Sequence, residues 1–327
     1  PSAVINTAGA PRVPLTNYKA MTTRLLNRPP GLQWPWRELA KLSEIDVGHI
    51  TTIIAGTGHG KTSVALNLAL HFLKQGKTVS FWSGEMASEI LVGKLQGMQA
   101  KMGLKAIISE LRQQQAGMPV SKKFLDSIPI IEKYCENFHI PEVKANRVAD
   151  VLEDIDKVSP DVILLDYIQQ LHPSRRYRTR DEEVESVMDD LNKYSINSKL
   201  PIVLFAQINR EARNVEKPEI HHVRHSATVE QYSSNVIGVW NSAMAYHKGS
   251  SPQVPGGWYW KNDADTTARA IAAAEAEGKS LTELIILKSR YHGNVGKAVP
   301  LLFHGPTGIL EDFPISTSRV TSRVVSL

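Results

Sequence analysis

A glycine-rich segment between a predicted strand and a predicted helix constrains this chain more than any other feature. The apolar residues of 49–56 predict a buried strand, and Ala55-Gly56-Thr57-Gly58-His59-Gly60-Lys61-Thr62 closes it. A helix over 60–75 with apolar residues on more than one side follows at once. Small residues let backbone N–H groups converge on phosphate oxygens, and the helix N-terminus adds partial positive charge. The segment therefore predicts a phosphate-binding loop.

The polar side chains of this loop have distinct expected roles. Lys61 can reach β- and γ-phosphates, and the Thr62 hydroxyl can ligate Mg²⁺. The predicted nucleotide-binding residues are Gly56, Thr57, Gly58, His59, Gly60, Lys61, Thr62 and Ser63. The His59 side chain is assigned no role of its own. The alternative, a strand-to-helix turn with a surface lysine, is disfavoured by the Lys-Thr pair between a strand and a helix.

The alternation of strands and helices predicts an α/β fold. Apolar runs without a polar face, such as 162–165, belong in a sheet that is covered on both faces, so a mostly parallel central sheet with helices on both faces is expected. A C-terminal hairpin of 298–303 and 309–313 completes it. Strands are predicted at 78–83, 128–131, 162–166, 202–207, 236–240 and 284–287, and helices at 146–158 and 181–198.

The distribution of proline, glycine and serine predicts the domain organisation. Residues 1–30 are expected to be an arm or linker with one short helix near 16–27. Residues 31–313 are expected to form one large α/β domain, and about 247–280 looks like an insertion within it. The Ser/Thr/Val-rich residues 314–327 are predicted to be a mobile tail.

Composition excludes some classes of protein and leaves others open. The chain carries 38 Lys and Arg against 33 Asp and Glu, a formal charge of +5, which permits a polyanionic partner without requiring one. Cys135 is the single cysteine, so an internal disulfide and a thiolate zinc site are excluded, and a reducing, cytoplasmic location is expected. No apolar run approaches the roughly 18 residues of a membrane span.

Polar residues at the ends of predicted strands supply the candidate chemistry. Asp166 ends an apolar strand and can hold the Mg²⁺ shell beside the phosphate loop. Glu85 follows the strand 78–83 and can orient or deprotonate water, although an acid stabilised by a helix N-terminus is the alternative interpretation. Gln207 ends the strand 202–207 and places an amide where a γ-phosphate can be sensed.

Five motifs, in order, resemble the RecA-like motor domain of hexameric replicative DNA helicases, the DnaB-like family. They are the phosphate loop beginning with Ala55, Trp82-Ser83-Gly84-Glu85-Met86, Leu165-Asp166-Tyr167-Ile168-Gln169, Ala206-Gln207-Ile208-Asn209-Arg210, and Lys288-Ser289-Arg290 with Gly293 and Gly296. The resemblance covers about 31–313. It departs from the family at Tyr232-Ser233-Ser234, where acidic residues are usual, and at the insertion.

The resemblance implies a RecA-like P-loop ATPase that uses ATP and Mg²⁺, the metal being held by Thr62 and Asp166. It implies catalytic roles for Glu85, Asp166, Gln207, Lys288 and Arg290, the last two reaching the γ-phosphate of a neighbouring subunit. The expected function is a homo-oligomeric ring, expected to be a hexamer, that translocates on single-stranded DNA and unwinds duplex during replication, with primase and a helicase loader as further expected partners. The alternatives are a filament-forming recombination or repair ATPase and an ATP-controlled scaffold or loader.

Two basic segments are the candidates for contact with DNA. Residues 172–180 contain four arginines around Tyr177, a combination that suits a single-stranded backbone. A loop neutralised by the acidic residues that follow is the alternative interpretation. Residues 210–218 are the second candidate and mix both charges. The predicted contact residues are Arg175, Arg176, Arg178, Arg180, Arg210, Arg213 and Lys217.

Overall fold

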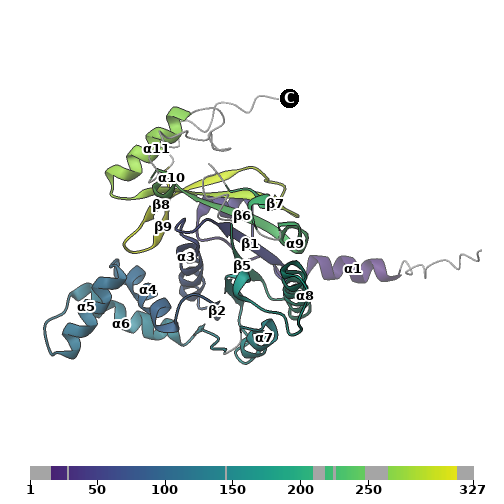
Figure 1. Cartoon of the computed structure of the whole chain (residues 1–327), viewed down its shortest axis with the longest axis horizontal. Coiled ribbons are helices and arrows are strands. Elements are labelled where there is room, and N and C mark those ends of the chain that lie inside the picture. The colour runs from purple at the N-terminus through teal and green to yellow at the C-terminus, as the bar shows by residue number, and fades with distance from the viewer. Residues whose placement is uncertain are drawn as a thin grey trace, which may run out of the picture. The chain divides into compact units, whose positions relative to one another are not determined.

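The computed structural model describes residues 16–27, 29–143, 146–208, 218–223, 226–246 and 264–314. The chain divides into two units, residues 1–31 and residues 32–327. Within the described residues of the first unit, the secondary-structure element is helix α1 (Thr16–Leu26). All other elements belong to the second unit (Figure 1). None of the helices in these ranges is long and apolar enough to cross a membrane.

A single sheet organises the second unit. In the part of the chain that is described it has nine strands in the order β3-β2-β4-β5-β1-β6-β7-β8-β9. The first six strands in this order are mutually parallel, and the last three joins are antiparallel. The strands are β1 (Ile50–Ala55), β2 (Val79–Ser83), β3 (Phe138–His139), β4 (Val162–Asp166), β5 (Ile202–Gln207), β6 (Ser233–Asn241), β7 (Ser280–Ser289), β8 (Ala298–His304) and β9 (Ile309–Asp312).

Helices cover both faces of this sheet, and Figure 1 shows α3 and α8 on opposite sides of it. Side chains along a strand alternate between two cores: Phe205 of β5 packs with the α3 and α4 side, and Leu204 packs with the α7 and α8 side. The helices are α2 (Arg37–Leu42), α3 (Lys61–Lys74), α4 (Ser88–Ala100), α5 (Leu104–Gln115), α6 (Lys122–Cys135), α7 (Val148–Asp156), α8 (Arg180–Ser198), α9 (Ser226–Tyr232), α10 (Ser242–Tyr246) and α11 (Ala264–Ala276), with short 3₁₀ turns η1 (Ile168–Gln170) and η3 (Ile220–His222).

The predicted fold class is confirmed, but one predicted strand is wrong. Residues 128–131 lie inside α6, which even contains Pro129. Phe124, Ser127 and Ile131 are its buried residues, a spacing of three and four that belongs to a helix. A short apolar run cannot be assigned to helix or strand by itself, and here the helical period of the flanking residues decided the structure. The prediction also missed α5 and the short strand β3.

The direction of the strands fixes which residues meet at each edge of the sheet. Since β1, β2, β4 and β5 are parallel, their carboxyl ends lie at one edge. Strand β7 runs the other way: its Ser289 pairs with Asn235 near the start of β6, and Asn235 pairs with Thr51 near the start of β1. The carboxyl end of β7 therefore lies at the opposite edge from the phosphate loop.

Candidate functional site

The loop between β1 and α3 has the backbone of a phosphate-binding turn. Gly58 and Gly60 have φ values of 86° and 92°, a region that disfavours side chains. A Cβ at Gly58 would also lie 2.8 Å from the Met244 sulfur of α10. Gly60 is the residue before α3, so the N–H groups of the first turn of that helix face the loop. The loop is thus shaped to bind an anion at a helix N-terminus.

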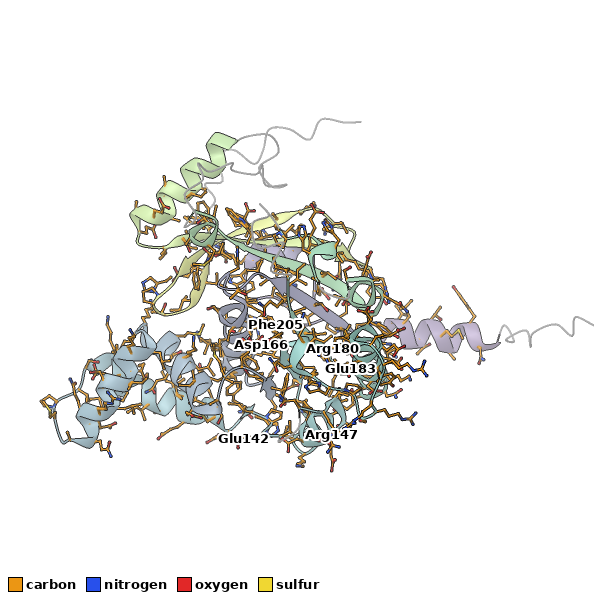
Figure 2. All side chains as sticks on the ribbon, viewed as in Figure 1. Glu142, Arg147, Asp166, Arg180, Glu183 and Phe205 are labelled. Carbon is orange, nitrogen blue, oxygen red and sulfur yellow. The ribbon has the colours of Figure 1, made fainter. Side chains whose placement is uncertain are left out.

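Lys61, Thr62 and Asp166 form a contact cluster where this loop meets the end of β4. Lys61 Nζ lies 2.6 Å from Asp166 Oδ1, and Thr62 Oγ1 donates to Asp166 Oδ2 over 2.9 Å. Asp166 is 1% exposed, and Figure 2 shows it beside Phe205, its register partner on β5. The ammonium also lies 3.8 Å above the centre of the Tyr167 ring.

These three side chains fit a nucleoside triphosphate and Mg²⁺. The short Lys61–Asp166 contact has no hydrogen bond of normal geometry, so both buried atoms retain bonding capacity. An ammonium, a hydroxyl and a carboxylate beside a helix N-terminus are the groups that hold β- and γ-phosphates and their metal ion. The sequence-predicted residues Lys61, Thr62 and Asp166 are therefore brought together, whereas the contribution of Tyr167 was not predicted.

Gln207 and Gln169 connect the loop to the ends of β4 and β5. Gln207 Nε2 donates to the Thr57 hydroxyl over 2.6 Å. The Gln169 amide accepts from the Gln207 backbone N–H over 3.3 Å and donates to the Gln207 carbonyl over 3.2 Å. Gln169 thus extends the β4–β5 pairing by one side chain. It lies in a motif that the sequence had singled out, but no role had been assigned to it.

Glu85 lies at the same edge, just beyond β2, and is exposed. The turn that carries it is fixed on both sides: the Gly84 N–H donates to the Asp166 carbonyl over 2.8 Å, and the Met86 N–H donates to the Ser83 hydroxyl over 3.0 Å. A Cβ at Gly84 would lie 2.6 Å from Gln170 Cβ, so only glycine allows this approach. The turn thus holds Glu85 one residue after the Gly84 N–H that bonds to Asp166, with its side chain exposed.

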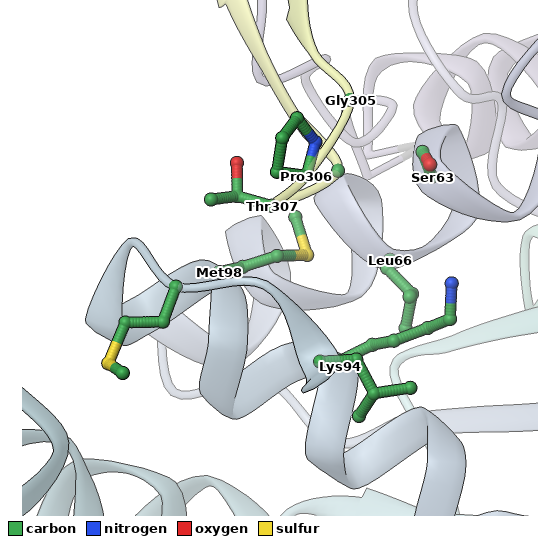
Figure 3. Close-up of a pocket in the computed structure, with 10 residues that line it drawn as sticks. Ser63, Leu66, Lys94, Met98, Gly305, Pro306 and Thr307 are labelled. Atoms are coloured by element: carbon green, nitrogen blue, oxygen red, sulfur yellow. The ribbon is translucent and has the colours of Figure 1, made fainter. Parts of the chain in front are cut away.

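Ser63, the last predicted nucleotide-binding residue, lines a small cavity (Figure 3). The cavity of about 60 Å³ lies between α3, α4 and the β8–β9 turn, and it has room for water but not for a nucleotide. Asn67 joins the turn to α3: its Nδ2 donates to the Gly308 carbonyl over 2.8 Å, and its Oδ1 accepts from the Leu310 N–H over 3.1 Å. The hairpin therefore packs on the first turns of the helix.

Lys288 and Arg290 lie at the opposite edge of the sheet and do not approach the phosphate loop. Lys288 Nζ donates to the Glu230 carbonyl, and Arg290 Nη2 donates to the Gln231 carbonyl over 3.0 Å. Both acceptors belong to the last turn of α9, whose carbonyls carry partial negative charge. Burial and the nearby Arg290 lower the pKa of Lys288.

The arginines of 172–180 are placed in two different ways. Arg175, Arg176 and Arg178 are exposed on the loop between η1 and α8. Arg180 instead bonds to the protein: Nη2 donates to the Gln169 carbonyl over 2.8 Å, and Nη1 donates to Glu183 over 2.5 Å. Figure 2 shows Arg180 beside Glu183 at the start of α8. The candidates Arg210, Arg213 and Lys217 lie outside the described residues.

Comparison with known proteins identifies the family of this chain. Fold and site together define an α/β protein of the P-loop nucleotide-binding class. Residues 38–311 match the family model described as the DnaB-like helicase C terminal domain, which is most of the chain. The chain belongs to that family. The resemblance that the five sequence motifs indicated is therefore confirmed.

Curated relatives carry helicase names. A probable plasmid replicative DNA helicase of Chlamydia psittaci is 25% identical over 199 residues, which cover 58% of this chain and 42% of that protein. The replicative DNA helicase DnaB of Leifsonia xyli is 21% identical over 226 residues, covering 67% of this chain and 48% of that protein. The chain thus spans less than half the length of these relatives.

Solved structures share the fold. A DnaB-like replicative helicase, described together with its interactions with primase, superposes with a TM-score of 0.70 at 17% identity and covers 91% of this chain and 66% of that one. An ATPase domain superposes with a TM-score of 0.68 at 18% identity, covering 92% of this chain and 97% of that one.

His59 of the phosphate loop gives a prediction about stability. Burial lowers its pKa from 6.5 to about 4, and its Nδ1 accepts from the Asn241 N–H over 3.1 Å, so the folded protein favours the neutral ring. As the pH falls from about 6.5 to about 4, the unfolded chain gains a proton that the folded chain does not, so stability is lost in this window. The loss is about 2–3 kcal/mol between pH 7 and pH 4.5.

Urea titrations of the wild type and of His59→Gln at both pH values measure this loss. Glutamine can still accept from the Asn241 N–H but does not titrate. The wild type should therefore lose about 2–3 kcal/mol more free energy of unfolding than the variant. An equal loss of unfolding free energy in the two proteins would show that His59 is protonated at pH 4.5 in the folded state as readily as in the unfolded chain.

Proposed function

We propose that this chain is the ATP-hydrolysing motor of a replicative DNA helicase, which assembles as a ring of six copies, moves along single-stranded DNA and separates the duplex. One observation carries the proposal: the residues suited to hold a nucleotide and those suited to neutralise its γ-phosphate lie at opposite edges of one sheet. The helicase names of the relatives support it.

Hydrolysis would begin with rearrangement of the contact cluster. Lys61 would leave Asp166 for phosphate oxygens, and Thr62 and Asp166 would then hold Mg²⁺, which supplies charge neutralisation on the phosphates. Glu85 is placed to orient or deprotonate the attacking water. Gln207, which bonds to Thr57 of the loop, is placed to respond to the γ-phosphate.

Arg290 requires a second copy of the chain. The two edges of the sheet are separated by the length of β1, six residues or roughly 20 Å. An arginine side chain on the β7 side cannot cover that distance to the phosphate loop of its own chain. A cation supplied from a neighbouring subunit would stabilise transition-state charge, an effect of about 10³–10⁵ in rate in well-studied cases.

The DNA contacts are proposed to come from the edge that carries the nucleotide. The loop with Arg175, Arg176 and Arg178 starts from the end of β4, directly after Asp166 and Gln169. Arg180 is better explained as the residue that holds this loop, because its guanidinium bonds to the Gln169 carbonyl and to Glu183. Primase is a further proposed partner, since a structure of the same fold is described with it.

The function is tested by ATP hydrolysis and strand displacement. The chain should hydrolyse ATP faster with single-stranded DNA than without it and should displace a labelled strand from a forked duplex. Lys61→Ala should abolish both activities, because the phosphates lose their lysine. ATP hydrolysis without strand displacement would favour the scaffold or loader, and assemblies that grow with protein concentration and DNA length would favour a filament.

The shared site is tested by mixing two inactive variants. Arg290→Ala should abolish turnover while nucleotide binding is retained, and Lys61→Ala should disable the other half of the site. Mixed assemblies contain seams with an intact Lys61 from one chain and an intact Arg290 from the other, so part of the ATPase activity should return. A mixture as inactive as its components would contradict the shared site.

The exposed arginines and Arg180 should affect the salt dependence of DNA binding differently. Replacing both Arg175 and Arg176 by alanine should remove about two phosphate contacts and lower the slope of log affinity against log salt by about 1.4 for single-stranded DNA. Arg180→Ala should leave the slope unchanged, because its guanidinium is bonded within the protein. Fluorescence anisotropy titrations at several salt concentrations measure the slope. A decrease of about 0.7 in the slope for Arg180→Ala, the value of one phosphate contact, would place Arg180 on the DNA.

A further inference from the structure

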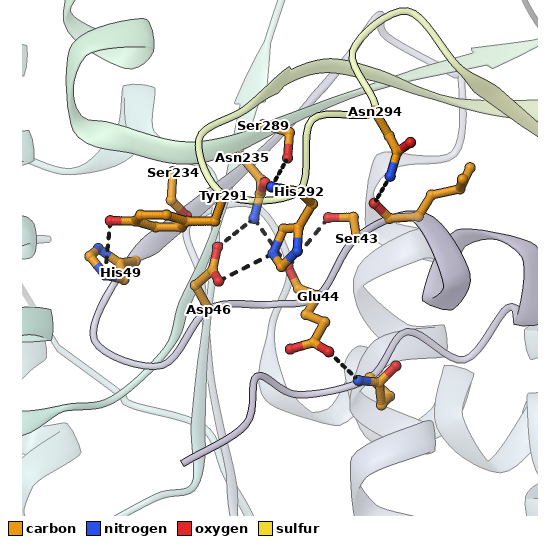
Figure 4. Close-up of polar contacts among 12 residues, drawn as sticks. Ser43, Glu44, Asp46, His49, Ser234, Asn235, Ser289, Tyr291, His292 and Asn294 are labelled. Carbon is orange, nitrogen blue, oxygen red and sulfur yellow. Dashed lines mark hydrogen bonds and ion pairs between the residues drawn. The ribbon is translucent and has the colours of Figure 1, made fainter. Parts of the chain in front are cut away.

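A buried polar cluster lies beneath the turn that follows β7 (Figure 4). Its centre is Asp46, 6% exposed, in the segment between α2 and β1. Asp46 Oδ2 accepts from Asn235 Nδ2 over 2.8 Å, and Asp46 Oδ1 lies 3.3 Å from His292 Nε2. Asn235 is fully buried on β6 and also donates to the Glu44 carbonyl over 3.1 Å. A carboxylate from one segment thus joins a strand to the β7–β8 turn.

Further contacts fix the same turn at Arg290 and at the residues after it. The Arg290 N–H donates to the Ser234 carbonyl over 2.8 Å. Tyr291 OH lies 3.4 Å from His49 Nε2, and Asn294 Nδ2 donates to the Leu42 carbonyl over 2.6 Å. Figure 4 shows the contacts of Tyr291 and Asn294 reaching from the turn to the chain before β1. The backbone that carries Arg290 is therefore held by several independent hydrogen bonds.

The Arg290 side chain is held in a different way. It is exposed, and the hydrogen bond shown for its guanidinium goes to the Gln231 carbonyl of α9. A carbonyl at the end of a helix can accept from water instead of from this donor at little cost, which frees the guanidinium to bond to a phosphate. The backbone of Arg290 is thus fixed by contacts with largely buried groups, while its guanidinium has a hydrogen-bond partner that can be exchanged. That combination allows an arginine to change partner without losing its starting position.

We propose that Asp46 and His292 are positioning residues for Arg290: they fix the β7–β8 turn so that the guanidinium reaches the nucleotide of a neighbouring copy. The inference rests on the proposed function, because it assumes that Arg290 acts across a seam. Asp46 and His292 touch no nucleotide and belong functionally to the arginine half of the site. A displacement of about 1 Å in a catalytic group can lower the rate on the order of 10²-fold.

The test is which variant can restore the activity of Asp46→Ala in a mixture. Asp46→Ala should lower kcat for ATP by about ten- to a hundredfold and leave the KM for ATP nearly unchanged, because its own phosphate loop is intact. Mixed with Lys61→Ala, it should regain part of its activity, since the seam then pairs its phosphate loop with a correctly held Arg290. Mixed with Arg290→Ala, it should gain nothing, because both variants are defective in the same half.

A matched control separates positioning from general stability. Asp154 also pairs with a histidine, His139, at 3.0 Å, but it lies on α7 and its partner on β3, the terminal strand of the sheet and six strands away from β7. Asp154→Ala should leave kcat within about twofold of the wild type at a temperature where both variants are folded. A loss of kcat in Asp154→Ala equal to that of Asp46→Ala would overturn the inference.

A second variant and a parallel control mixture complete the test. His292→Asn, at a half-buried position, removes the ring without creating a buried cavity and should behave like Asp46→Ala in both mixtures even if Asp46→Ala does not fold. Recovery with both partners, or with neither, would contradict the positioning role. The mixture of Lys61→Ala with Arg290→Ala is run in parallel: if that mixture stays inactive, the shared site fails, and if it recovers, only the role of Asp46 and His292 is in question.

Discussion

The polarity of one sheet governs the arrangement of this molecule. Parallel pairing brings the ends of β1, β2, β4 and β5 to one edge, and the antiparallel join between β6 and β7 sends the end of β7 to the other. No local adjustment can bring the two sets together, because the strands between them are stiff and buried. A chain built in this way carries its phosphate loop and Arg290 at opposite edges of one sheet.

Side-chain hydrogen bonds to backbone groups hold the irregular segments at both edges. Gln169 extends the pairing of β4 and β5, and the Gly84 N–H attaches the Glu85 turn to the end of β4. At the other edge, Asn235 and Asn294 donate to the carbonyls of Glu44 and Leu42. Amides suit this task because they offer a donor and an acceptor without a charge to desolvate. Loops next to a rigid sheet thereby acquire defined positions.

Much of the fold could be predicted because its signals are local. The glycine-rich loop, the apolar run ending in Asp166 and the continuous apolar strands each depend on a few neighbouring residues. The strand predicted at 128–131 is wrong for the same reason. A run of four apolar residues fits the period of a strand or of a helix, and only packing over the whole of α6 makes it helical. The strand β3 has two residues and leaves almost no pattern to recognise.

The sequence by itself determined the phosphate loop, the apolar strands β1, β2, β4 and β5 and the polar residues at their ends, because backbone preference and hydrophobic period depend on adjacent residues. The tertiary structure decided what those residues face. It joined Arg180 to Gln169, packed the His59 ring against Asn241, and brought Asp46 into contact with His292, 246 positions later in the chain. Such contacts depend on strand register and direction, which arise only when distant segments pack together.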